Sequence, residues 1–304
     1  MAAQTPAAVS VSGRVLRGGR DTVPLANAWV VLHRVTSQGG GPIDSVRTDA
    51  RGRYGILLRH PDSSGVYVVS AWYDSLAYFS LPISLSGRGG GAHVEDLIAY
   101  ATTTNAPPIR LARRLATIAH AGDDGTREVL EILELENTGQ TTRITKDTLV
   151  PTWAGRVPEN AVQFQGGQGD ISPEAIIFRN DSIHVLGPIP PGPVKQLTYG
   201  YNLPANIRTF VLPIDQTTHE VNLLVEDTAA VVRAPGLESL GVQEVDKRRF
   251  AAYRAGPLAA GDKVEIVLPQ KFRAQMVLPY VIAILAAGMV LALVWALRKR
   301  PAAA

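Results

Sequence analysis

Residues 9–19 read VSVSGRVLRGG, in which valine alternates with polar residues until two glycines end the run. Side chains two residues apart share one face of a β-strand, so this stretch predicts a strand with one apolar face. Similar runs follow at short intervals: PLANAWVVLHRV (24–35), DSVRTDARGRYGILL (44–58) and SGVYVVSAWYDSLAYFSLPISL (64–85). Short apolar runs between turn residues are typical of an all-β domain.

The stretch TDARGRY (48–54) has the residues of a tight turn. The carboxylate of Asp49 can accept hydrogen bonds from the turn backbone, and Gly52 can adopt a positive φ at little cost. We expect a hairpin here, with no catalytic role for the aspartate.

The order of these signals resembles the carboxypeptidase regulatory-like family over residues 8–100. The matching residues are Gly13, Val15, Pro24, Leu25, Ala28, Val30, Leu32, Thr48, Asp49, Gly52 and Tyr54. The resemblance implies a transthyretin-type β-sandwich that serves as an accessory module, and a fold by itself implies no chemistry. The stretch TSQGGGPIDS (36–45) is longer than the family's loop at this point, so we expect a solvated linker or a loop shaped by a partner.

A segment rich in glycine, threonine and proline, residues 87–114, separates this domain from a second series of short apolar runs. One of these, REVLEILELENTG (127–139), alternates apolar and acidic residues, although a short helix is an alternative. The spacing favours a second β-sandwich. The predicted divisions are an N-terminal extension 1–7, a first sandwich 8–102, a linker 103–110 and a second sandwich 111–268.

The chain ends in a long apolar run. Residues 276–297 contain no charged side chain, and a helix of this length spans the roughly 30 Å hydrocarbon core of a bilayer. Tyr280 and Trp295 lie near opposite ends, where aromatic rings favour the membrane interface. We therefore predict two β-sandwich domains, a juxtamembrane segment 269–275, a single C-terminal transmembrane helix 276–297 and a basic tail 298–304.

The flanking charges indicate how this anchor is oriented and used. Arg298, Lys299 and Arg300 directly follow the span, which favours a cytoplasmic C-terminus and places the bulk on the periplasmic side of the cell inner membrane. The alternative is a cytosolic tail-anchored protein, because MAAQTPAAVS (1–10) is not a signal peptide, although it resembles the residues around a signal-peptidase cut. The small residues that recur at one helical face are expected to pack against another transmembrane helix. They are Gly288, Ala292 and Ala296.

Composition argues against several functions. The net charge of +3 comes without a basic, aromatic stripe, so we expect no nucleic acid partner. The chain has no cysteine, its histidines are isolated, and no catalytic, phosphate-binding or dinucleotide motif occurs, so we predict a non-enzyme with no cofactor and no metal. His120, Asp123 and Asp124 form the nearest approach to a site, but HAGDDGTRE (120–128) reads more simply as a polar hairpin turn. A pair of carboxylates brought together by folding stays open.

Two β-sandwich domains with one membrane anchor resemble an accessory extrinsic subunit of a bacterial photosynthetic reaction-centre and light-harvesting complex. The resemblance implies a structural subunit whose partners are the lipid bilayer and a membrane protein complex of reaction-centre and antenna subunits. A periplasmic ligand-binding or sensing module is the alternative. The short tail 298–304 leaves little room for a signalling domain, which favours the structural role.

Overall fold

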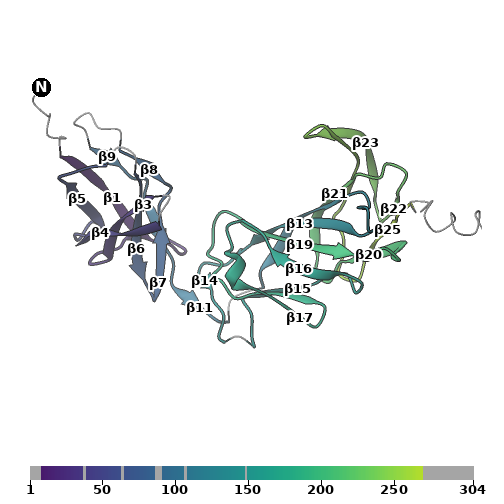
Figure 1. Ribbon diagram of the computed structural model, residues 1–304. Helices are drawn as coiled ribbons and strands as arrows, with labels where there is room; N and C mark the ends of the chain where they lie inside the picture. Colours follow the sequence, from purple (N-terminus) through teal and green to yellow (C-terminus); the bar gives the residue numbers. More distant parts are fainter. Residues whose placement is uncertain are drawn as a thin grey trace, which may run out of the picture.

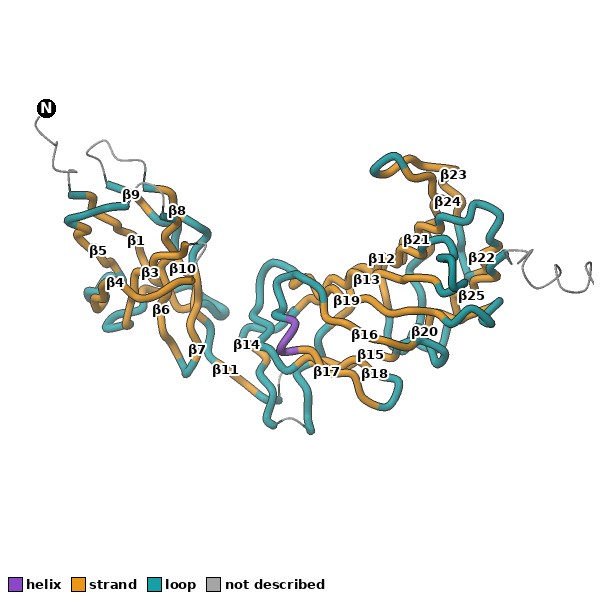
Figure 2. Tube along the Cα trace, in the orientation of Figure 1, coloured by secondary structure: helices purple, strands orange, loops and turns teal. Residues whose placement is uncertain are grey.

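The structure, a computed structural model, describes residues 8–36, 39–62, 65–85, 91–105, 108–147 and 149–269. They form two units, one on each side of the molecule (Figure 1). Strands dominate both units (Figure 2), and the described residues include one 3₁₀ turn, η1 at Pro173–Ala175. The predicted all-β fold built from β-sandwich domains is confirmed.

The first unit is a sandwich of two sheets. One sheet has the order β10-β1-β2 with β5 and β9 also paired to β1, and the other has the order β4-β3-β6-β7 with β8 also paired to β6. Their inward side chains form one core that includes Val11, Leu32 and Tyr67. The strands are β1 Val9–Arg17, β2 Val23–Pro24, β3 Trp29–Thr36, β4 Gly39–Arg47, β5 Arg53–Leu58, β6 Val66–Tyr73, β7 Leu76–Phe79, β8 Ile83–Ser84, β9 Ala92–His93 and β10 Leu97–Ala99.

The turn between β4 and β5 has the predicted chemistry but not the predicted pairing. The Asp49 carboxylate accepts hydrogen bonds from the N–H groups of Arg51 and Arg53, each at 2.8 Å, and Gly52 has a φ of +73°. However, β4 pairs with β3 and β5 pairs with β1, so the two strands lie in different sheets. The expected hairpin is therefore wrong: the turn carries the chain across the sandwich.

The glycine-rich stretch at 36–45 is also not the expected loop. Residues 39–45 belong to β4, which pairs antiparallel with β3 from Thr36↔Gly39 to Trp29↔Arg47. Because β4 is an edge strand, its proline and glycines remove few ladder contacts, and a proline at an edge discourages further pairing.

The second unit is built on a large sheet with the order β16-β19-β13-β12-β21-β24-β23. Two smaller sheets, β15-β18-β17 and β20-β25-β22, share one continuous hydrophobic core with it. Within the segment 127–139, residues Arg127–Glu136 form strand β13 rather than the alternative helix. The strands are β12 Arg110–Ile118, β13 Arg127–Glu136, β15 Trp153–Arg156, β16 Val162–Gly166, β17 Ile176–Arg179, β18 Ser182–Val185, β19 Lys195–Leu203, β20 Thr209–Pro213, β21 Thr218–Val225, β22 Val231–Arg233, β23 Glu238–Val245, β24 Arg248–Ala255 and β25 Lys263–Val267.

This second core contains a buried ion pair. Arg114 of β12 and Glu131 of β13 are 2% and 0% exposed, and the guanidinium Nε donates to Glu131 Oε2 at 2.6 Å. Tyr201 donates to the other carboxylate oxygen at 2.8 Å, and Arg114 Nη1 donates to the Pro213 carbonyl at 2.7 Å. Burial and the Glu131 carboxylate raise the pKa of Tyr201 well above its ordinary value. The pair links the large sheet to strand β20.

The two units meet around a short parallel strand pair, β11 Thr102–Thr103 with β14 Thr142–Arg143. Tyr78 of β7 reinforces the junction, since its hydroxyl donates to the Tyr100 carbonyl at 2.7 Å and bonds Thr142 Oγ1 at 2.8 Å. Burial raises the pKa of this Tyr78 hydroxyl. Strand β11 spans the predicted boundary between residues 102 and 103.

The predicted juxtamembrane segment, transmembrane helix 276–297 and basic tail lie outside the described residues, apart from Pro269 at the start of the juxtamembrane segment. Within the described ranges, no helix has the length and apolar character needed to cross a membrane.

Candidate docking site

The two central strands of the sheet β4-β3-β6-β7 carry mostly apolar side chains on both faces. In β3 and β6 the side chains of alternate residues enter the core, so the intervening residues point outward. None of these outward positions, all of which are described, holds an acidic residue, lysine or arginine. We call this surface the aromatic face. It consists of Trp29, Val31, His33 and Val35 of β3, Val66, Val68, Ser70 and Trp72 of β6, and Ala77 and Phe79 of β7.

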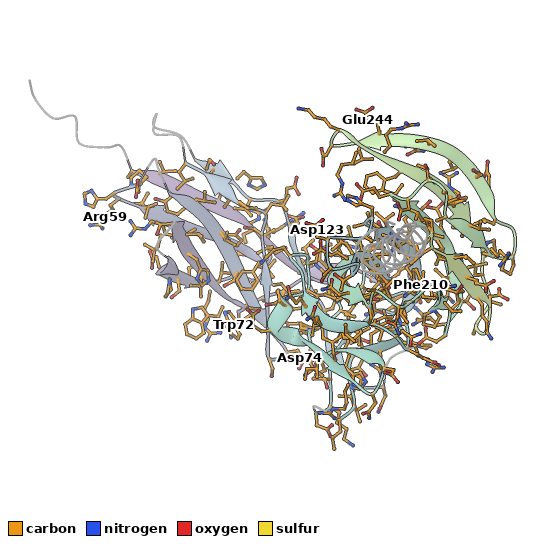
Figure 3. All side chains as sticks on the ribbon, turned by 45° about the vertical axis from the view of Figure 1, so that its right-hand side comes forward. Arg59, Trp72, Asp74, Asp123, Phe210 and Glu244 are labelled. Carbon is orange, nitrogen blue, oxygen red and sulfur yellow. The ribbon has the colours of Figure 1, made fainter. Side chains whose placement is uncertain are left out.

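Two tryptophans lie side by side at one end of this face. Trp29 and Trp72 are directly opposite each other across the β3–β6 ladder, and each keeps about half of its surface exposed, 51% and 49%. Figure 3 shows Trp72 on the outer side of the first unit, away from the core. Arg47 of β4, opposite Trp29, places its guanidinium carbon 6.0 Å from that ring centroid, at the limit of a cation–π contact.

The rest of the aromatic face is ordered by local contacts. His33 Nε2 bonds the Ser70 hydroxyl at 2.8 Å, and the His33 ring lies 6.1 Å from that of Phe79. Val31 is buried although it does not belong to the core cluster, so its neighbours on the outer surface cover it. Phe79 remains 61% exposed. The face is thus a packed layer on which Trp29, Trp72 and Phe79 still offer about half of their surface or more.

The opposite sheet of the same sandwich behaves as an ordinary solvent-facing sheet. The outward positions of β1 and β5 include Ser10, Ser12, Arg14 and Arg53. Leu57, 57% exposed, lies at one end of the face, and the apolar pair Leu16 and Ile98 lies at the other. Antiparallel sheets commonly bury one face and solvate the other. The aromatic face departs from that pattern, because five of its large apolar side chains are exposed. Exposed apolar groups that gather on one surface mark an interaction site.

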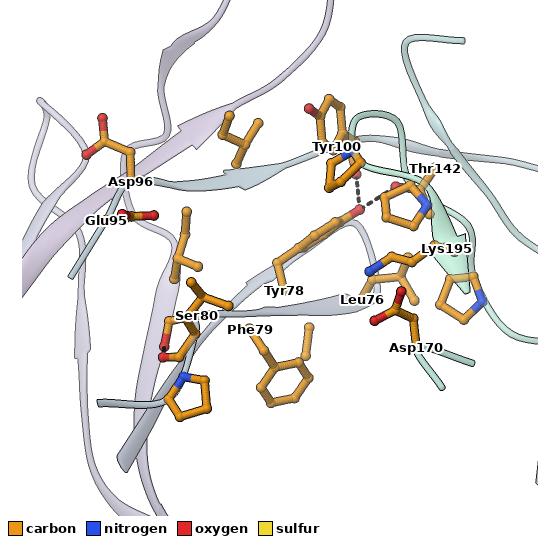
Figure 4. Close-up of a pocket in the computed structure, with 18 of the residues that line it drawn as sticks. Leu76, Tyr78, Phe79, Ser80, Glu95, Asp96, Tyr100, Thr142, Asp170 and Lys195 are labelled. Carbon is orange, nitrogen blue, oxygen red and sulfur yellow. Dashed lines mark hydrogen bonds between the residues drawn. The ribbon is translucent and has the colours of Figure 1, made fainter. Parts of the chain in front are cut away.

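A second candidate site is a cleft between the two units. A cleft of about 880 Å³ is lined on one side by Leu76–Pro82 of the first unit and on the other by the proline-rich stretch around 187–193 of the second. Figure 4 shows Tyr78 and Tyr100 within it, together with Glu95, Asp170 and Lys195.

None of the residues predicted for membrane contact can be placed, because all lie beyond Pro269 and outside the described residues. They are Gly288, Ala292, Ala296, Tyr280, Trp295, Arg298, Lys299 and Arg300.

The segment containing His120 is the predicted polar turn between β12 and β13. The backbone N–H of His120 donates to Glu226 Oε2, and its ring Nδ1 lies 2.8 Å from the same oxygen, while Asp124 accepts hydrogen bonds from Thr126. In the described part of the chain, no three histidine, cysteine or acidic residues are grouped so that they could hold a metal ion.

The sequence patterns did not single out the aromatic face. The signal that marks it is the lack of alternation in WVVL (29–32) and VYVV (66–69), which are continuous apolar runs. Such runs are typical of strands buried on both faces. These runs indicate which strands have two apolar faces, but the pairing of Trp29 with Trp72 depends on the register of the sheet.

No family model and no curated protein matches the chain. Similar solved structures include an M1 zinc metallopeptidase from Deinococcus radiodurans, at a TM-score of 0.32 and 11% identity, over 53% of this chain and 42% of that one. A DUF3823 family protein from Parabacteroides merdae is similar at a TM-score of 0.23 and 9% identity, over 68% of this chain and 88% of that one. The major pilin SpaA of Corynebacterium diphtheriae is similar at a TM-score of 0.22 and 9% identity, over 86% of this chain and 84% of that one. The chain spans less than half the length of the metallopeptidase, and likenesses this weak carry no argument about activity.

Proposed function

We propose that this protein is a non-enzymatic, membrane-anchored assembly subunit that docks on a partner protein through its aromatic face. The observation that carries the proposal is the outer surface of β3 and β6, which is apolar where a solvent-facing sheet would be polar. The predicted helix at 276–297 would hold the subunit at the membrane.

The residue types favour a protein partner over a lipid surface. Tryptophan and arginine are the residues most enriched at binding hot spots, and here Trp29, Trp72 and Arg47 are neighbours. The face is a sheet surface rather than a protruding loop or an amphipathic helix rich in basic residues, which is the form that membrane-surface binding usually takes. Burying the exposed half of one such ring removes about 100 Å² from water, equivalent to about 2.5 kcal/mol before the costs of association.

The alternative function, a ligand-binding or sensing module, is favoured by one observation, the cleft of about 880 Å³ between the units. Ligand sites of about 300–1,000 Å³ are common at domain interfaces. Reaction-centre and antenna subunits, the partners that the resemblance implies, remain a prediction, as does the periplasmic location.

The test is co-purification from native membranes in mild detergent. The double variant Trp29→Ser, Trp72→Ser should lose a stoichiometric partner that the wild type retains, because the two largest exposed rings of the face are gone. Leu57→Ser is the matched control: it removes a similarly exposed apolar side chain from the opposite, polar sheet and should keep the partner.

Equal partner recovery with the double variant and the wild type would refute the role of the aromatic face. A wild-type protein that purifies alone from its own membrane would refute the assembly function itself.

A further inference from the structure

Strand β7 is an edge strand whose free side is ready to pair. It forms a ladder with β6 alone among the described strands. The N–H of Ser80 donates to the Val69 carbonyl at 2.8 Å, which sets the phase of the ladder. Backbone groups alternate in direction along an antiparallel pair, so Leu76 and Tyr78 also face β6. The N–H and C=O groups of Ala77 and Phe79 therefore point away from the sheet.

The cleft between the two units runs along this strand. Five consecutive residues that line it, 76–80, comprise the whole of β7 and Ser80. At about 3.3 Å per residue the strand is about 13 Å long. The unpaired backbone groups of Ala77 and Phe79 thus lie beside a space large enough for another segment of chain.

The facing wall forms no ladder with β7 among the described residues. Four of the eleven residues that the second unit contributes to the cleft are prolines, and a proline has no backbone N–H to donate to a strand. The prolines also stiffen that part of the wall. The prolines are Pro188, Pro190, Pro191 and Pro193.

Hydrogen bonds in and beside the cleft hold the two units together. The Tyr78 hydroxyl bonds both the Tyr100 carbonyl and Thr142 Oγ1, as described above. In the turn after β6, the Asp74 carboxylate accepts hydrogen bonds from the backbone and hydroxyl of Thr102. A preformed site lowers the entropic cost of binding an extended segment.

We propose that this cleft binds an extended polypeptide segment of a partner protein, which adds to β7 as a further strand. Main-chain hydrogen bonds to Ala77 and Phe79 supply affinity, and the apolar walls receive alternate side chains. The added strand runs antiparallel, as do all the ladders of this sheet, and antiparallel pairing is the more stable kind.

Charged side chains at the two ends of β7 indicate which residues the segment would carry there. Figure 4 shows Glu95 towards the Ser80 end and Lys195 towards the Leu76 end. Asp170, beside Lys195, is already engaged, because it accepts a hydrogen bond from the Gln196 N–H. An antiparallel segment enters beside Glu95 and leaves beside Lys195. A basic residue early in the segment and an acidic residue late in it are therefore favoured.

The probe is the peptide fluorescein-Gly-Gly-Lys-Val-Thr-Val-Thr-Glu-amide, labelled at its N-terminus so that the lysine keeps its charge, titrated against the full chain in detergent by fluorescence polarisation. Two N-methylated versions, blocked at alternate amides, form the decisive pair. Because only one set of amides faces β7, one version should lose about tenfold or more in affinity and the other should bind like the parent. The peptide with lysine and glutamate exchanged should bind more weakly.

The protein variants test the same edge. Ala77→Pro removes an outward N–H while leaving the β6–β7 ladder bonds, and should weaken binding about tenfold or more. Ala77→Val keeps that N–H and is the matched control. Near-ultraviolet circular dichroism shows whether Ala77→Pro folds. If it does not, the comparison of the two N-methylated peptides on wild-type protein still tests the proposal.

Equal binding of the two N-methylated peptides, or no saturable binding of the parent, would overturn the proposal, as would a small molecule that binds the cleft while the parent peptide does not. Tighter binding of the exchanged peptide would overturn the antiparallel direction. The double variant Trp29→Ser, Trp72→Ser should bind the peptide like the wild type, so a failure of this proposal and a failure of the docking function give different results.

Discussion

Replacing Glu131, the buried carboxylate of the second unit, should lower the free energy of unfolding. In Glu131→Gln, the guanidinium of Arg114 stays charged, because arginine keeps its proton under all ordinary conditions. It also stays buried, at 2% exposure, and loses the anion that it contacts at 2.6 Å. Removing one partner of a buried ion pair costs about 3–5 kcal/mol, so we expect a loss of that size in the free energy of unfolding.

Removing the whole polar group should cost less than removing half of it. The triple variant Arg114→Met, Glu131→Leu, Tyr201→Phe leaves no buried charge at this site and keeps comparable volumes. The Pro213 carbonyl loses its donor, and the buried Tyr199 hydroxyl loses its charged neighbours. Apolar replacement of a complete buried pair is often neutral or stabilising. We therefore expect the triple variant to be more stable than the single variant.

Denaturant unfolding of the full chain, followed by the fluorescence of Trp153, measures both variants. Trp153 is buried in the second core, and it becomes the sole reporter in a background with Trp29→Phe, Trp72→Phe and Trp295→Phe. A loss below about 1 kcal/mol for Glu131→Gln would refute the reasoning, because it would mean that Arg114 is solvated in the folded protein. A triple variant less stable than the single one would refute it as well.

Two further predictions concern a turn and an acid-sensitive contact. Gly52→Ala should lower the free energy of unfolding by about 2 kcal/mol or more, because φ is +73° and a Cβ would overlap the Val15 carbonyl oxygen. The control Gly55→Ala has open space around it and should change the free energy of unfolding little. Equal losses in the two variants, measured by thermal or denaturant unfolding, would contradict this. Hydrogen bonds from Arg248 hold the pKa of Glu226 at about 2, below its ordinary value of 4.5, so the stability from this contact is complete above pH 4.5 and is lost as the pH falls towards 2. Denaturant titrations should show this loss in the wild type and a smaller one in Glu226→Gln, and identical pH profiles would contradict the assignment.

Local chemistry allowed the strands and turns to be predicted from the sequence. Alternation placed Val9, Val11 and Val15 on one face of β1, and all three are in the core. The turn at Asp49 and Gly52 follows from a carboxylate next to backbone donors and from the freedom of glycine, which are properties of a few adjacent residues. The strand period also indicated β13 at 127–139, although the composition left a helix open.

Pairing was decided by the tertiary structure alone. Alternation says which side chains share a face but not which strand lies next to which, so β4 and β5 enter different sheets and Gly39 begins a strand instead of lying in a loop. Trp29 and Trp72 become one surface only because the β3–β6 register sets them opposite each other. A shift of one residue would send one of them into the core. The aromatic face therefore depends on contacts between residues far apart in the chain, and those contacts form only as the sandwich folds.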